Sequence, residues 1–260
     1  MPQFGLGVWQ ASDDEARVAV RTAIESGYRS IDTAAIYANE GGVGRGLRES
    51  GVAREDIFLT TKIWNSAQGS GSTEKALEES LRRLDTPYLD LLLIHWPVAS
   101  RGLYLETWKA MIGLRDKGLV RSIGVSNFQP AHLDRLLEET GETPVLNQIE
   151  LHPYFQQASL REVHRKLGII TESWSPLAQN QALSDPIVER IAGKHGKTAA
   201  QVVIRWHLDN GLVVIPKSVT PSRIQSNIEV FDFSLDSDDL SAIGSLNENR
   251  RIGPDPDTFG

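Results

Sequence analysis

The regular alternation of short apolar segments with amphipathic helical segments constrains the fold most strongly, and it continues along nearly all of the 260 residues. Such alternation is typical of parallel sheets, in which each helix carries the chain back to the start of the next strand. The segments that we expect to form strands are 4–9, 28–31, 57–61, 89–94, 120–125, 146–150, 169–174 and 212–215. Eight parallel strands can close without leaving an exposed edge, so the sequence predicts a (β/α)8 TIM barrel.

The alternative architecture is an open, doubly wound sheet, which needs a glycine-rich phosphate turn after an early strand. The nearest candidate, Gly42-Val-Gly44-Arg-Gly46, has the wrong glycine spacing and lies within a helical pattern. The chain length also favours the barrel, because such barrels typically need about 250 residues. No linker or abrupt change in composition divides the chain, so we expect residues 1–260 to form a single domain.

The helical segments contain their own start and stop signals. Ser12-Asp-Asp-Glu15 and Thr198-Ala-Ala-Gln201 are capping boxes, and Gly27 and Gly211 stand where C-caps are expected. The first helix therefore runs from the first capping box to Gly27. The later helices are expected at 43–50, 73–84, 105–117, 131–140, 159–167, 186–195, 198–209, 222–230 and 237–246.

Composition excludes several functions. The net charge is −7 and there is no basic run, which argues against nucleic acid or an anionic membrane surface as the main partner. Without cysteine, disulfides, thiolate nucleophiles and cysteine-bound metals are excluded. The six histidines show no metal-ligand spacing, so we expect no metal site. No apolar run approaches the ~20 residues of a membrane span, and we expect a cytoplasmic protein.

Polar and aromatic residues gather at the carboxyl ends of the predicted strands, where barrel enzymes keep their active sites. In chain order they are Trp9, Asp32 with Tyr37, Lys62 with Trp64, His95 with Trp96, Ser126 with Asn127, Gln148, Trp174 with Ser175, and Lys217 with Ser218. Four of the six tryptophans fall on this rim, and aromatic walls are typical of a ligand pocket.

Taken singly, each polar residue has an ordinary structural explanation. Asp32 could form a turn, Lys62 could be a solvated charge, and His95 could be a hydrogen-bonded structural residue. Their occurrence on three successive strand ends, together with Tyr37, favours a catalytic set instead. The chemistry that it allows is proton donation by a phenol. Tyrosine titrates near pH ~10, so it needs an adjacent ammonium to stabilise the phenolate and a carboxylate to hold that ammonium.

The sequence resembles the aldo-keto reductases over nearly its whole length. The motifs that carry the resemblance are Gly27-Tyr-Arg-Ser-Ile-Asp-Thr-Ala-Ala-Ile-Tyr37-Ala-Asn-Glu40, Leu59-Thr-Thr-Lys62-Ile-Trp-Asn65, Leu91-Leu-Leu-Ile-His95-Trp-Pro97, Ser122-Ile-Gly-Val-Ser-Asn-Phe128, Asn147-Gln-Ile-Glu-Leu-His-Pro153 and Val214-Ile-Pro-Lys-Ser218. Ile63-Trp64-Asn65 and Glu172-Ser-Trp-Ser-Pro-Leu177 add a likeness to the bacterial branch that includes 2,5-diketo-D-gluconate reductase.

The resemblance implies reduction of aldehydes or ketones, such as small dicarbonyls or keto sugars, by hydride transfer from NADPH. Tyr37 would be the general acid, with Lys62 and Asp32 tuning it and His95 orienting the substrate. Trp9, Trp64 and Trp96 would line the substrate pocket. The residues that would hold the cofactor, from its nicotinamide to its adenosine 2′-phosphate, are Trp174, Ser126, Asn127, Gln148, Ser175, Leu177, Lys217, Ser218, Arg223 and Asn227. Two cations and a hydroxyl beside a phosphate favour NADPH over NADH.

Three departures from the family pattern accompany the resemblance. Ser226 stands where many members have a glutamate that contacts the adenine. The chain enters its first strand directly from Met1-Pro-Gln, so we expect the family's N-terminal hairpin to be absent, with some loss of stability. The tail after Leu246 is short, so we expect it to contribute little to substrate specificity. The family default is a monomer.

Two further functions stay open at this point. A Schiff-base aldolase would use Lys62 as its nucleophile and would need no nicotinamide. A cofactor-binding sensor or channel-associated subunit of the same fold would bind NADPH with negligible turnover. The complete set of four polar residues disfavours the sensor.

Overall fold

The computed structural model describes residues 1–260, in which eight parallel strands follow one another in chain order. The strands are β1 (Leu6–Gly7), β2 (Ser30–Asp32), β3 (Phe58–Ile63), β4 (Leu89–Ile94), β5 (Val120–Ser126), β6 (Leu146–Glu150), β7 (Ile170–Trp174) and β8 (Val213–Val214). The sheet closes between its first and last strands, since the amide of Gly5 donates to Val214 O at 3.0 Å and that of Gly7 to Pro216 O at 3.2 Å. The predicted (β/α)8 barrel is confirmed.

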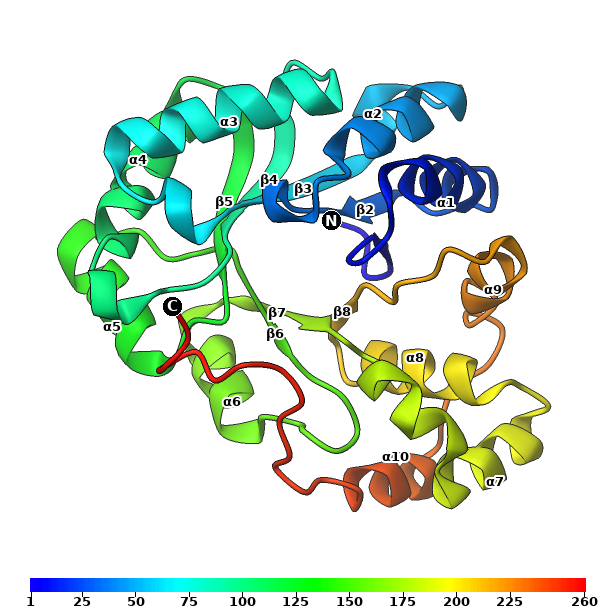
Figure 1. The fold of residues 1–260 in the computed structure, drawn as a ribbon. Coiled ribbons are helices and arrows are strands. Elements are labelled where there is room, and N and C mark those ends of the chain that lie inside the picture. Colours follow the sequence, from blue (N-terminus) through cyan, green and yellow to red (C-terminus); the bar gives the residue numbers. More distant parts are fainter.

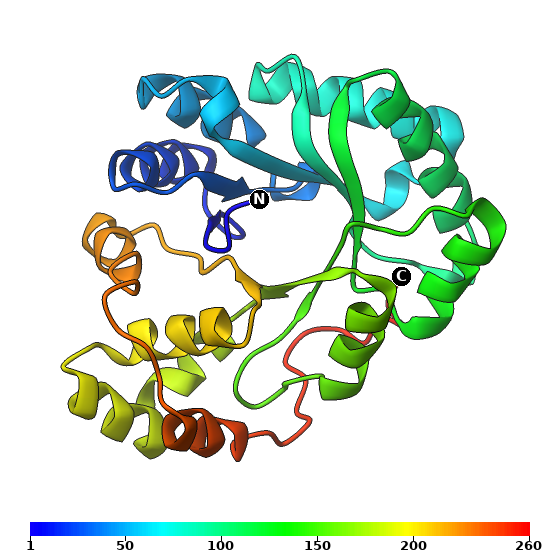
Figure 2. The ribbon, with the colours of Figure 1, turned by 180° about the vertical axis from the view of Figure 1, so that it is seen from behind.

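Helices form a ring around the strands (Figures 1 and 2). They are α1 (Asp13–Glu25), α2 (Glu40–Glu49), α3 (Ser70–Leu84), α4 (Tyr104–Asp116), α5 (Pro130–Thr140), α6 (Ala158–Leu167), α7 (Pro186–His195), α8 (Ala199–Asp209), α9 (Pro221–Asn227) and α10 (Ser237–Gly244). Both predicted capping boxes are present, at Ser12 and Thr198. No helix is both long and apolar enough to cross a membrane.

The first and last strands are shorter than predicted. The segments 4–9 and 212–215 reduce to two residues each, and their flanking residues pair only through single bridges. After β8, Pro216 has no N–H to continue a hydrogen-bond ladder. α3 begins three residues before the predicted 73, because the Ser-Gly-Ser start of the helix has no apolar periodicity for the pattern to detect.

The glycines of the rejected phosphate turn have a packing role. They lie in α2, and a Cβ on Gly42 or Gly44 would overlap the backbone of Asp13 or Leu84. A Cβ on Gly46 would stand 2.6 Å from Arg17 O. These glycines therefore let α2 pack backbone to backbone between its neighbours. The prediction that this segment is helical is confirmed.

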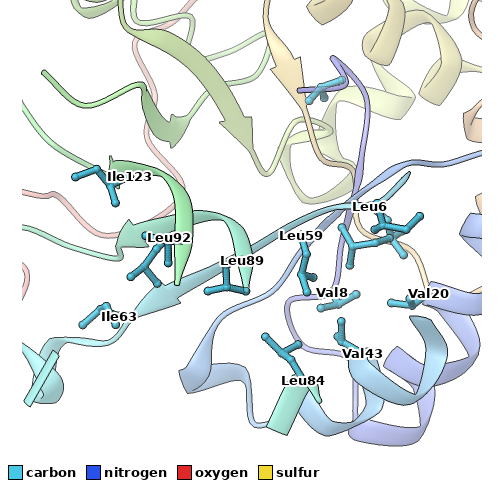
Figure 3. Packing of buried hydrophobic residues seen from close by; sticks show 14 of the residues in the cluster. Leu6, Val8, Val20, Val43, Leu59, Ile63, Leu84, Leu89, Leu92 and Ile123 are labelled. Carbon is cyan, nitrogen blue, oxygen red and sulfur yellow. The ribbon is translucent and has the colours of Figure 1, made fainter. Parts of the chain in front are cut away.

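Apolar side chains on the outer face of the sheet pack against the helices and form the largest core cluster, part of which is shown in Figure 3. All six residues of β4 are buried, as predicted for a strand covered on both faces. Leu92 belongs to the outer cluster, whereas Leu91 and Leu93 pack with Leu146 inside the barrel. Because side chains alternate along a strand, β4 separates the helix-facing core from the interior that leads to the site.

Candidate active site

The register of the strands brings the first two candidate residues together. Asp32 on β2 pairs with Thr60 on β3, so Asp32, Thr60 and Lys62 point to the same face of the sheet. Lys62 in turn pairs with Leu93, which faces the barrel interior. The carboxylate and the ammonium therefore meet inside the barrel near its carboxyl-end mouth.

Asp32 and Lys62 form a buried ion pair. Lys62 Nζ lies 2.5 Å from Asp32 Oδ1, and the two side chains are 0% and 4% exposed. The ammonium also donates to the backbone oxygen of Thr33 at 2.8 Å. Burial alone would lower the pKa of Lys62, but the negative charge and hydrogen bond of Asp32 outweigh it and raise that pKa. Lys62 is therefore a fixed cation at neutral pH.

Tyr37 stands beside this cation in the short 3₁₀ helix Ala35–Tyr37 that follows β2. Lys62 Nζ lies 5.3 Å from the centre of its ring. Burial raises the pKa of the Tyr37 phenol, and the charge of Lys62 acts in the opposite direction. The phenol is thus held protonated at neutral pH, next to a group that favours its ionised form.

His95 follows β4 and completes the group. Its ring is edge-on to Tyr37, with ring centroids 5.7 Å apart, and also edge-on to Trp64, at 5.1 Å. Burial and the positive charge of Lys62 hold the pKa of His95 well below its usual range, so the imidazole is neutral. Its Nδ1 is buried without a hydrogen-bond partner. A neutral imidazole offers one N–H donor to a ligand.

A network of amide side chains adjoins the four residues. Ser126 pairs with Gln148 across β5 and β6, and Ser126 Oγ donates to Gln148 O at 2.8 Å. Asn127 has a left-handed backbone, with φ of 65°, and its Nδ2 donates to His95 O at 3.0 Å. Its Oδ1 accepts from Trp174 Nε1 at 2.9 Å, which fixes the indole at the end of β7. The structure therefore brings Ser126, Asn127, Gln148 and Trp174 together with His95.

The remaining predicted cofactor residues lie along the ends of β7 and β8. Ser175 and Leu177 directly follow Trp174, and Ser175 also has a positive φ, of 49°. Lys217 and Arg223 are exposed, and neither forms an ion pair with another side chain. Ser218 accepts a hydrogen bond from Thr220 N at 3.2 Å. The last predicted residue of this set is the buried Asn227, at the end of α9. Ser226, the departure from the family pattern, is partly buried in the same helix, and its Oγ donates to Arg223 O at 3.3 Å.

Comparison with known proteins gives the family. Residues 1–248 match the Aldo/keto reductase family. The chain belongs to this family. It is 56% identical over 259 residues to an aldo-keto reductase of Mycolicibacterium smegmatis, and 55% identical over 262 residues to methylglyoxal reductase DkgA of Escherichia coli K12; each match covers 100% of this chain and 94% of the relative. A mutant of Gox0644 solved in complex with NADPH has a TM-score of 0.96 and 54% identity, covering 100% of this chain and 95% of that one.

The three tryptophans proposed for the substrate pocket of this aldo-keto reductase differ in their surroundings. Trp64 packs edge-on against His95, next to Tyr37. Trp96 is 7% exposed and contacts Phe259, with ring centroids 4.5 Å apart. Trp9 is 43% exposed, so its indole is largely open to solvent. Trp64 therefore stands beside the polar group, Trp96 packs against the tail, and Trp9 is the most exposed of the three.

The C-terminal tail (residues 247–260), which we expect to contribute little to substrate specificity, packs back against the barrel end that carries the predicted site residues. It leaves α10 and runs back inside the ring of helices (Figures 1 and 2). The buried carboxylate of Glu150 accepts from the amides of Ile252, at 2.5 Å, and Gly253, at 2.9 Å. Phe259 reaches Trp96. The tail is thus held against Glu150 at the end of β6 and against Trp96 after β4.

Gly253 is the tightest point of the tail, which gives a testable prediction. A Cβ at this position would overlap the indole of Trp174 and lie 2.9 Å from Glu150 Oε2. We expect Gly253→Ala to lower the free energy of unfolding by about 1–3 kcal/mol, the usual cost of overpacking, or to release the tail. Hydrogen exchange of residues 247–260 and chemical denaturation measure the two outcomes. Gly244→Ala is the matched control, since nothing lies within 4 Å of a Cβ there. Unchanged exchange and stability in Gly253→Ala would contradict the tight packing.

Two buried acids of the site were not predicted from the sequence. Glu150 anchors the tail, and Glu172 lies in the barrel interior bonded to Gln148. Glu172 pairs with Gln148 in the register of β6 and β7, and it stands two residues before Trp174 on the same face. That spacing of two was visible in the sequence, and it was the signal that could have placed Glu172 inside the barrel.

Proposed function

We propose that this protein reduces aldehydes and ketones to alcohols with NADPH, and that its substrates are small dicarbonyls or keto sugars. The observation that carries the proposal is the group of Tyr37, Lys62, Asp32 and His95 at the mouth of an aldo/keto reductase barrel. When bound, NADPH supplies the hydride that reduces the carbonyl carbon. The chain's own residues supply the proton for the carbonyl oxygen.

Tyr37 is the proposed general acid. Its partly buried phenol has a raised pKa and so carries a proton at neutral pH, as an acid must. As the proton leaves, the phenolate forms beside the ammonium of Lys62, which lowers the cost of that charge. Asp32 keeps the ammonium charged and in place through the 2.5 Å contact. The neutral imidazole of His95 donates an N–H to the carbonyl oxygen and orients it toward the phenol.

The chain's residues fit the proposed cofactor along its length. Trp174, held by Asn127, offers an aromatic face for the nicotinamide, and Ser126, Asn127 and Gln148 offer hydrogen bonds to its amide. Ser175 and Leu177 would lie along the pyrophosphate. The residues at the 2′-phosphate would be Lys217, Ser218, Arg223 and Asn227. The absence of a carboxylate paired with either cation supports a phosphate partner, and thus NADPH rather than NADH.

The proposed substrates follow from the pocket and from the relatives. Trp9, Trp64 and Trp96 would wall the substrate, and Phe259 of the tail packs against Trp96. An aromatic wall of this kind would suit small carbonyl compounds. The name methylglyoxal reductase, given to the similar DkgA enzymes, agrees with a small dicarbonyl. With a net charge of −7, we infer that nucleic acid is not a partner, and we propose that the enzyme acts as a cytoplasmic monomer.

The Schiff-base alternative is disfavoured by the state of Lys62. A nucleophilic lysine must lose its proton, which requires a lowered pKa. Here Asp32 raises the pKa of Lys62, and its ammonium is committed to Asp32 and Thr33 O. Borohydride treatment in the presence of a carbonyl is therefore expected to leave Lys62 unmodified.

The proposal is tested by following the loss of NADPH absorbance with a panel of carbonyl compounds. The panel comprises methylglyoxal, simple aldehydes and keto sugars, each assayed with NADPH and with NADH in parallel. We expect turnover with NADPH, faster with the small dicarbonyls than with simple ketones. Tight NADPH binding without consumption on any carbonyl would instead indicate the cofactor-binding sensor.

A further inference from the structure

Glu172 is a buried acid that the mechanism above does not use. It lies on β7, is 1% exposed, and points into the barrel interior. Its Oε2 accepts a hydrogen bond from Gln148 Nε2 at 2.9 Å. A buried carboxyl group is costly, so its place beside the proposed cofactor residues calls for an explanation.

The amide of Gln148 connects Glu172 to the catalytic group. Its Nε2 donates to Asp32 Oδ2 and to Glu172 Oε2, each at 2.9 Å. An amide nitrogen has two hydrogens, so both are committed to carboxyl oxygens. The reverse orientation would place the carbonyl oxygen of Gln148 against the carboxylate of Asp32. The two acids therefore fix the amide, and its Oε1 is left free to accept a hydrogen bond.

The charges of Asp32 and Lys62 determine whether Glu172 is protonated. The charged groups that face it are Asp32 on β2 and Lys62 on β3, whereas β6 contributes the neutral Gln148 and β8 the apolar Val213. One ammonium is already paired with one carboxylate. Burial, and then the negative charge of Asp32, raise the pKa of Glu172 to about 8. At neutral pH Glu172 is a carboxylic acid and the cluster has no net charge.

We propose that Glu172, in its protonated form, is a positioning residue that holds the Gln148 amide with its Oε1 turned toward the carboxamide of the bound cofactor. The inference rests on the proposed function, because Gln148 is expected to face the nicotinamide amide. Ionisation of Glu172 adds a second negative charge that competes with Asp32 for Lys62. A carboxylate still accepts from Gln148, so the loss falls on the orientation of the ammonium beside Tyr37.

Two variants separate the protonated form from the ionised one. Glu172→Gln keeps an oxygen that accepts from Gln148 and cannot ionise, so it imitates the acid. Glu172→Ala removes the acceptor and leaves one amide N–H of Gln148 unpaired. An unpaired buried donor typically changes the equilibrium constant of the arrangement that contains it by about 5- to 100-fold. By fluorescence titration near neutral pH, we expect Glu172→Gln to bind NADPH within about twofold of the unmodified protein. We expect Glu172→Ala to bind it about tenfold more weakly.

The pH profile supplies a second readout. The kcat/KM of the unmodified protein is expected to fall above about pH 8, and this part of the fall should be absent in Glu172→Gln. Equal losses of NADPH affinity in both variants would show that the carboxylate is the active form and would overturn the proposal. Normal affinity in Glu172→Ala would also overturn it. If the unmodified protein neither binds NADPH nor reduces carbonyls, it is the proposed function that fails.

A stability measurement tests the protonated state without any cofactor, even if Glu172→Ala does not fold. Below pH 4.5 Glu172 is protonated in both the folded and the unfolded chain, so it adds no pH dependence to the free energy of unfolding. Between pH 4.5 and about 8 unfolding releases its proton, and stability therefore falls as pH rises. The unfolding midpoint of Glu172→Gln should rise relative to the unmodified protein across this window and then level off. A constant difference would contradict a protonated Glu172.

Discussion

Tyr37→Phe is expected to lower turnover by about 100- to 10,000-fold, the range that a positioned general acid supplies. The substitution removes the hydroxyl group alone, and the ring keeps its edge contact with His95 and its place beside Lys62. Binding of NADPH should therefore be unchanged. Steady-state kinetics with the best carbonyl of the panel measures the first effect, and fluorescence titration with NADPH measures the second. Normal turnover in Tyr37→Phe would show that the proton comes from another group.

Asp32→Asn is the matched comparison for Tyr37→Phe. An asparagine keeps an oxygen that can accept from Lys62, so the ammonium stays near the phenol with less electrostatic support. In the proposed mechanism Asp32 would act through Lys62, whereas Tyr37 would contact the substrate. We therefore expect Asp32→Asn to lose less turnover than Tyr37→Phe. The opposite order would mean that the roles of the two residues are assigned wrongly.

The barrel and the four-residue group were predictable because both depend on local patterns. Each strand is marked by its own apolar run. Three of the four catalytic candidates stand at or directly after a strand end, as Asp32 and His95 do, and Tyr37 follows in the loop after β2. Parallel strands bring their carboxyl ends to one side of the sheet, so sequence order alone implied that these residues lie close together. The distances then depend on register, which joins Asp32 to Lys62 through Thr60.

The rest of the site depends on contacts that no local pattern reports. Glu150 binds the amide of Gly253, which is 103 residues further along the chain, and Gln148 binds Asp32 across 116 residues. A backbone amide has no sequence signature, so the path of the tail could not be predicted from Glu150. The protonated state of Glu172 was equally hidden, because it follows from burial and from a neighbouring charge that only the folded barrel assembles.

The direction in which the pKa of Tyr37 shifts could also be determined only from the structure. The sequence predicted an ammonium that favours the phenolate, and Lys62 does act in that direction. Burial acts the other way and is the larger effect, so the pKa of the Tyr37 phenol lies above its usual value. Lys62 thus offsets part of the cost of burying a phenol that, in the proposed mechanism, ionises during each turnover. Removal of Lys62 should expose that cost.

Lys62→Met is expected to damage both stability and catalysis. The carboxylate of Asp32 would lose its ammonium and keep only the hydrogen bond from Gln148. Loss of one partner from a buried ion pair typically lowers the free energy of unfolding by about 3–5 kcal/mol. Turnover should fall by at least about 100-fold, because the phenolate would form without a neighbouring cation. Chemical denaturation and steady-state kinetics measure the two losses.

The double variant Lys62→Met/Asp32→Asn separates these two roles of Lys62. It removes the ammonium and the carboxylate together, so no unpaired charge remains at this position in the barrel. We expect it to be more stable than Lys62→Met alone, a non-additive result typical of residues in direct contact. Turnover should not recover, because the cation beside Tyr37 is still missing. A double variant as unstable as Lys62→Met would show that the cost lies in lost packing of the lysine chain, and a recovery of turnover would remove Lys62 from the mechanism.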